Sequence, residues 1–146
     1  MTFQNVASYL ALGALLVVLL WLLLRPWRRR RAYQRALLNP AVLSAACWWA
    51  DELSRTTGGI STEGICRFRA SLAGLIASAS VFNQDALYHD IGPACDGYRF
   101  LRAAADEAGI DIRFSFPFTV KMRIREHHVL VSRSGGALWE PIWRNW

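Results

Sequence analysis

The stretch FSFPFTVKMRI, residues 114–124, decides the fold class, because its apolar residues recur at every second position. Between them stand Thr119, Lys121 and Arg123, which are polar or charged. Such alternation is typical of a β-strand with one face in the core and one face in solvent. Pro117, near the start, favours an edge strand or a bulge. The apolar members of the strand are Phe116, Phe118, Val120, Met122 and Ile124.

A second strand is predicted for VLVS, residues 129–132, and the two strands are close enough in sequence to form an antiparallel hairpin. Gly135 and Gly136 then turn the chain again. The tail ALWEPIWRNW, residues 137–146, either adds an edge strand or packs over the sheet. The C-terminal third is therefore predicted to be β-structure.

Upstream of the strands, the apolar spacing changes to that of amphipathic helices. A helix over residues 41–56 places Val42, Ala46, Trp49 and Leu53 on one face and Asp51, Glu52 and Arg55 on the other side. Ser61 is a suitable N-cap for a second helix over residues 62–79.

A short strand at residues 86–91 and a third helix at residues 94–108 follow, and Gly109 is suited to end that helix. The predicted fold is α+β: one N-terminal transmembrane helix, then a small domain of order α-α-β-α-β-β that ends in an antiparallel hairpin.

The transmembrane helix is predicted from residues 6–24, VASYLALGALLVVLLWLLL, which contain no charged residue, Asn, Gln or Pro. A helix of about 20 apolar residues spans the hydrocarbon core of a bilayer. The lack of any polar face argues against a buried helix of a globular domain. A cleaved signal peptide is disfavoured, because residues 1–5 carry no charged side chain and no small-residue cleavage site follows. The segment is therefore interpreted as a single-pass signal anchor.

Six arginines lie within residues 25–35, and no acidic residue does. The positive-inside rule predicts an N-terminus outside and a C-terminal domain in the cytoplasm, at a bacterial inner membrane. The residues predicted to contact anionic lipid headgroups are Arg25, Trp27, Arg28, Arg29, Arg30 and Arg31. Residues 36–146 hold eleven basic and eleven acidic residues, so the whole net charge of +6 belongs to the arginine cluster. A neutral domain is not expected to bind nucleic acid.

These patterns divide the chain into three parts. Residues 1–24 form the N-terminal tail and transmembrane helix, residues 25–39 a basic juxtamembrane helix or linker, and residues 40–146 a small cytoplasmic α+β domain. The three cysteines are widely spaced, contain no CxxC pair and are expected to be free thiols. The oligomeric state stays open.

The polar residues around the predicted turn at Gly92 are the best candidates for catalysis. His89, Asp90 and Cys95 could supply a base, a carboxylate and a thiol for a small hydrolase or a metal-dependent enzyme. Against this, adjacent residues of a strand point to opposite faces, so His89 and Asp90 are not expected to act together. His127 and His128 lack the spacing of a metal site. No cofactor and no metal ion are predicted.

The tail is unusually rich in tryptophan, with Trp139, Trp143 and Trp146 spaced three or four residues apart. Surface tryptophans are typical of binding hot spots, so these three are candidate partner-binding residues. The alternatives are that they cover the core of their own domain or lie against the membrane.

Residues 43–138 resemble a group of small uncharacterised phage and prophage proteins. The resemblance rests on the pattern A-x-W-W-A-D-x-L, matched by residues 47–53, on Gly92-Pro93 before a helix that ends in residues 107–110 (EAGI), and on residues 116–118 (FPF) before a hairpin. It implies a mobile-element origin and no particular mechanism.

The functional hypothesis is a membrane-anchored interaction or regulatory protein with an unidentified protein partner, and the alternative is a membrane-tethered enzyme centred on His89, Asp90 and Cys95.

Overall fold

The computed structural model describes residues 3–82, 88–113, 115–116, 119–125 and 127–144, and of residues 3–12, 81–82, 88 and 144 it describes the backbone alone. The helices and strands follow in the order α1 (Phe3–Leu37), α2 (Pro40–Thr56), α3 (Thr62–Phe82), β1 (Tyr88–Ile91), α4 (Tyr98–Ala108), β2 (Lys121–Arg125), β3 (His128–Ser132) and β4 (Glu140–Arg144). From residue 40 onward the predicted order is confirmed, and the tail supplies β4 as a further strand.

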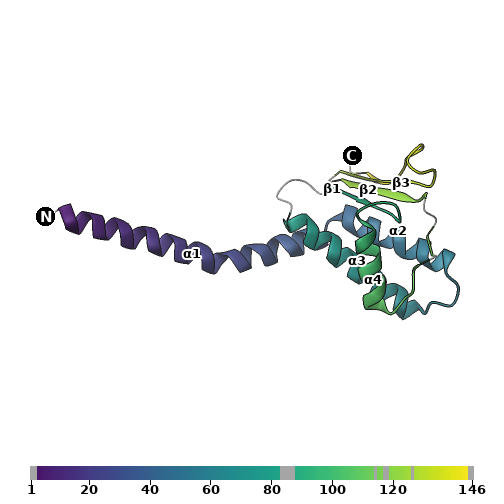
Figure 1. The fold of residues 1–146 in the computed structure, drawn as a ribbon, viewed down its shortest axis with the longest axis horizontal. Coiled ribbons are helices and arrows are strands. Elements are labelled where there is room, and N and C mark those ends of the chain that lie inside the picture. Colours follow the sequence, from purple (N-terminus) through teal and green to yellow (C-terminus); the bar gives the residue numbers. More distant parts are fainter. Residues whose placement is uncertain (1–2, 83–87, 114, 117–118, 126, 145–146) are drawn as a thin grey trace.

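The strands form one antiparallel sheet of order β1-β2-β3-β4, and the helices α2, α3 and α4 lie on one side of it (Figure 1). Side chains alternate along β2, where Met122 and Ile124 are buried against α2 and Arg123 is half-exposed on the other side. The register places Asp90, Arg123, Leu130 and Pro141 in one row across the four strands. This row lies on the open face of the sheet, away from the helices.

Helix α2 forms the centre of the core. Asn39 caps it, because its side-chain oxygen accepts a hydrogen bond from the amide of Ala41 at 2.8 Å. Trp49 and Leu53 have no exposed surface, and Trp49 packs edge-on against Phe116 with ring centroids 4.9 Å apart. The predicted apolar face of this helix is therefore its buried face.

The prediction for Glu52 was wrong, because its side chain is buried and not on the solvent side of α2. Its carboxylate accepts hydrogen bonds from Arg55 on the same helix at 2.6 Å and from Arg133, beyond β3, at 2.8 Å. Burial by itself raises the pKa of Glu52, but the hydrogen bonds from Arg133 and Arg55 outweigh it and lower the pKa. Helical periodicity could not reveal an ion pair whose partners lie 81 residues apart.

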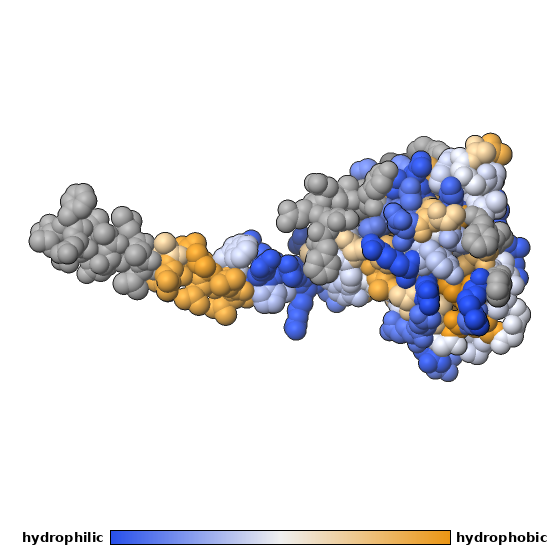
Figure 2. Space-filling model, in the orientation of Figure 1, coloured by the Kyte–Doolittle hydropathy of each residue, from blue (hydrophilic) through white to orange (hydrophobic). Residues whose placement is uncertain are grey.

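Helix α1 is continuous across the boundary predicted between residues 24 and 25, and it projects from the rest of the chain (Figure 1). Its side chains from Leu15 to Leu24 are exposed, and hydrophilic residues follow them toward the domain (Figure 2). The division into residues 1–24, 25–39 and 40–146 stays a prediction.

No helix in the described part of the chain has the length and apolar character needed to cross a membrane, which overturns the predicted transmembrane helix.

The single-pass signal anchor, the inner-membrane location and the outside–inside orientation rested on that helix and are corrected with it. The anionic lipid partner is likewise unsupported.

Two of the arginines predicted to contact lipid lie over tryptophan rings of α1. The Arg31 guanidinium lies 3.7 Å from the centroid of the Trp27 ring, and the Arg25 guanidinium lies 5.1 Å from the centroid of the Trp21 ring.

Candidate functional site

The predicted catalytic residues meet at the turn between β1 and α4. The amide of Cys95 donates to the carbonyl of Gly92 at 3.0 Å, and the amide of Tyr98 donates to the carbonyl of Cys95 at 2.9 Å. These bonds form a compact turn, so α4 begins at Tyr98 and not at residue 94. A shallow depression of about 480 Å³ lies over the turn, lined by His89, Asp90, Ala94, Cys95, Asp96, Gly97, Arg99 and Phe100.

His89 is held in place by two neighbours. Its Nε2 lies 3.3 Å from the hydroxyl of Ser80, and its ring packs edge-on against Phe100 at 5.7 Å. The Ser80 hydroxyl donates its hydrogen to the carbonyl of Ile76 at 2.8 Å. Because a hydroxyl has one hydrogen, Ser80 accepts from His89, so His89 is not placed to remove the proton of Ser80.

Asp90 and Cys95 are also poorly arranged for catalysis. Asp90 points to the open face of the sheet, where its carboxylate accepts a hydrogen bond from Arg125 at 3.1 Å and lies 3.5 Å from Arg123. Burial raises the pKa of the Cys95 thiol above its ordinary value, with Lys121 opposing and Asp90 and Asp96 adding to the rise. A nucleophilic cysteine needs a lowered pKa. The three candidates share one depression but do not form a catalytic set.

Within the residues that the structure describes, no three side chains of His, Cys, Asp or Glu gather where they could hold a metal ion. His128 stands on β3 opposite Arg125, and His127 is exposed in the turn before it.

Burial lowers the pKa of His89 below its ordinary value of 6.5, and Arg125 and Arg99 lower it further, while Asp90 opposes them. The unfolded chain therefore binds a proton at His89 at a higher pH than the folded chain does. We expect the contribution of His89 to the free energy of unfolding to fall as the pH drops from about 6.5 to the pKa of the folded state. Below the pKa of the folded state this contribution should no longer change with pH. Denaturant titrations between pH 7.5 and 5 measure this pH dependence of the free energy of unfolding.

The matched variant His89→Gln cannot take up the proton. Its free energy of unfolding should change less over the same pH range, whatever its absolute stability. An unchanged pH slope in His89→Gln would assign the effect to another group.

The structure separates the three tryptophans of the tail. Trp143 is half-buried on the inner side of the sheet, opposite Val129, and packs against the core. Trp139 lies on the open side, where the Arg123 guanidinium stacks over its ring at 4.4 Å. Trp146 lies outside the described residues. Of the two described tail tryptophans, Trp139 is therefore the one placed for a partner on the open face.

Two neighbours of these candidates were missed from the sequence. Ser80 reaches His89 from the end of α3, and Arg123 connects Asp90 with Trp139. The alternation of residues 119–124 did place Arg123 on the polar face of its strand. The sequence around Arg123 does not show that Asp90 of β1 and Trp139 of the tail would lie beside it.

No protein-family model matches the chain, and no curated protein matches it. Among solved structures, a doubly substituted BTG/Tob domain of C. elegans FOG-3 is similar, with a TM-score of 0.61 over 74% of this chain and 91% of that chain. The fold is similar to that of a BTG/Tob domain. At 19% sequence identity the likeness to this domain concerns the fold alone. The resemblance to phage proteins is not tested by these comparisons and stays a prediction.

Proposed function

We propose that this chain is a protein-interaction domain that binds its partner on the open face of the sheet. The observation that carries the proposal is the group of Trp139, Arg123 and Leu130 on this face, next to the exposed Leu138 that precedes Trp139 in the chain. We call these four residues the open-face cluster. Leu138 is 73% exposed, and Leu130 and Arg123 stand opposite each other on β3 and β2. The sheet face that holds the cluster is not covered by the helices (Figure 1).

The chemistry of the open-face cluster suits a protein partner. Tryptophan and arginine are enriched among the residues that dominate protein interfaces. Arg123 already occupies one side of the Trp139 ring, and Asp90 lies beside its guanidinium. These contacts hold both side chains in place before a partner arrives, which reduces the entropy lost on binding. They also leave less of the ring free to stack on a nucleobase, which favours protein over nucleic acid.

The fold supports the same proposal, since BTG/Tob domains are protein-interaction domains. The arrangement at the β1–α4 turn supports it as well, because His89, Asp90 and Cys95 are each engaged in ways that suit structure better than catalysis.

A photo-crosslinking residue placed at Leu138 in the full chain, in its native host, tests this proposal. The matched control carries the same residue at Ser54, which is exposed on α2. We expect a discrete crosslinked protein from position 138 that position 54 does not give. With that protein purified, Trp139→Ala should weaken binding by about tenfold, as truncation of an interface hot spot does.

Leu43→Ala, at an exposed site on α2, serves as the control for binding. Equal binding of Trp139→Ala and Leu43→Ala to the captured protein would contradict the proposal, as would the same crosslinks from both positions.

A further inference from the structure

Helix α4 carries its charges in an order that opposes its own stability. Arg99 lies in its first turn, whereas Asp106 and Glu107 lie in its last. The helix dipole favours acidic residues at the N-terminus and basic residues at the C-terminus, so each of these charges stands at the less favourable end. A charge pattern that costs local stability calls for an explanation outside the helix.

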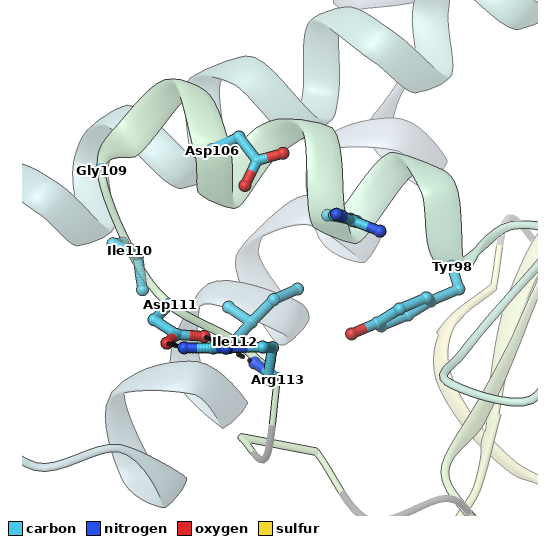
Figure 3. A pocket seen from close by; sticks show the side chains of 8 residues that line it. Tyr98, Asp106, Gly109, Ile110, Asp111, Ile112 and Arg113 are labelled. Carbon is cyan, nitrogen blue, oxygen red and sulfur yellow. Dashed lines mark hydrogen bonds and ion pairs between the residues drawn. The ribbon is translucent and has the colours of Figure 1, made fainter.

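Arg102 and Asp106 stand one turn apart on the exposed side of α4. They line one groove of about 680 Å³ between the helix and the segment that follows Gly109 (Figure 3). Base before acid is the weaker order for an i,i+4 pair. The side chains of Arg102 and Asp106 make no hydrogen bond or ion pair with any described residue. Both charges are thus available to a partner.

The other charges of the groove are already neutralised. Arg113 donates to Asp111 through Nε at 3.0 Å and through NH2 at 2.6 Å, and this pair lies along the wall opposite α4 (Figure 3). Tyr98 points from the start of α4 into the same groove (Figure 3). The groove therefore offers one free positive and one free negative charge.

We propose that a second copy of this chain occupies this surface, with the two α4 helices antiparallel about a two-fold axis. In that arrangement Arg102 of each copy faces Asp106 of the other, because residues four apart are separated by about 6 Å along a helix. A two-fold contact requires a surface that is complementary to itself, and one free charge of each sign on one helix face meets that requirement.

The antiparallel arrangement also explains the reversed charges. The basic half of each α4 meets the acidic half of the other. Ala103 is exposed on α4 beside Arg102 and Asp106, and its small side chain permits close approach of the helices. This dimer surface lies on α4 and is separate from the open-face cluster, so it adds to the proposed function and does not depend on it.

Two opposite charge reversals in the full chain test the proposal. Arg102→Glu leaves two acidic residues on the surface, and Asp106→Arg leaves two basic ones. We expect each variant alone to self-associate about tenfold more weakly than the original chain, because like charges then face each other across the axis. An equimolar mixture of the two variants should associate at least as tightly as the original chain, since every pair is complementary again.

Sedimentation equilibrium measures the single variants, and energy transfer between differently labelled variants measures the mixture. Arg67→Glu on α3 is the control for Arg102→Glu, because it makes the same change in net charge on another exposed helix surface. The proposal would be overturned if Arg102→Glu and Asp106→Arg self-associated as tightly as Arg67→Glu. Any self-association would then use another surface, for example the exposed residues of α1. A mixture that associates no better than its components would overturn it too.

Discussion

Replacement of Trp49 by alanine is expected to lower the free energy of unfolding by about 3–5 kcal/mol, the range for removing a large aromatic side chain from a core. Trp49 has no exposed surface. Its ring packs edge-on against Trp48 at 5.1 Å and against Phe116 at 4.9 Å, so alanine would leave a cavity between α2 and the segment before β2. The free energy of unfolding of a small domain is about 5–15 kcal/mol, so this loss is a large fraction of the stability.

Urea denaturation followed by circular dichroism measures this loss without relying on tryptophan fluorescence. Leu43→Ala removes an exposed side chain from the same helix and should change the free energy of unfolding by less than about 0.5 kcal/mol. Trp49→Phe keeps an aromatic ring and removes the indole N–H, which is buried with no hydrogen-bond partner among the described residues. Trp49→Phe should therefore lower the free energy of unfolding by much less than Trp49→Ala does. Equal losses for Trp49→Ala and Leu43→Ala would show that α2 does not form the core.

The local elements of this fold could be predicted where one physical signal dominates. The period of Val42, Ala46, Trp49 and Leu53 identified the buried face of α2. The N-cap prediction at Ser61 is confirmed, because its hydroxyl accepts from the amide of Gly64 at 3.1 Å. These features depend on neighbours within about one or two helical turns, and such neighbours are visible in a sequence.

Features that depend on distant partners could not be predicted in the same way. The sequence did not indicate that Arg133 would reach Glu52, or that Trp139 would stack on Arg123. The start of α4 was placed too early, because backbone hydrogen bonds at Gly92 and Cys95 form a turn that helical periodicity does not register.

The transmembrane prediction rested on the composition of residues 6–24 alone. Among the described residues no helix has the length and apolar character of a membrane span, so the structure contradicts this prediction.

The close approach of Gly97 to β1 leads to the last prediction. A Cβ atom at Gly97 would lie 2.3 Å from the carbonyl oxygen of Asp90 and 2.9 Å from the Cα of Ile91. The backbone of Gly97 is in the ordinary helical region, with φ of −70° and ψ of −4°, so conformational strain is not the reason for glycine here. Only the missing side chain lets the turn before α4 pack on β1.

We therefore expect Gly97→Ala to lower the free energy of unfolding by about 3 kcal/mol, at the upper end of the usual cost of overpacking, because backbone atoms cannot move aside as a flexible side chain can. Chemical denaturation measures the loss. Amide exchange at Ile91 should also accelerate, since the clash falls on β1.

Gly74→Ala on α3 is the matched control for this substitution. Its Cβ would meet the hydroxyl of Tyr33 at 3.1 Å, and this is the movable end of a side chain on α1. Alanine also favours a helix interior over glycine by roughly 0.5–1 kcal/mol, so Gly74→Ala should be close to neutral or stabilising. If Gly97→Ala proved as stable as Gly74→Ala, the turn that carries Cys95 would not be packed on β1, and the depression beside His89 would not have the shape described above.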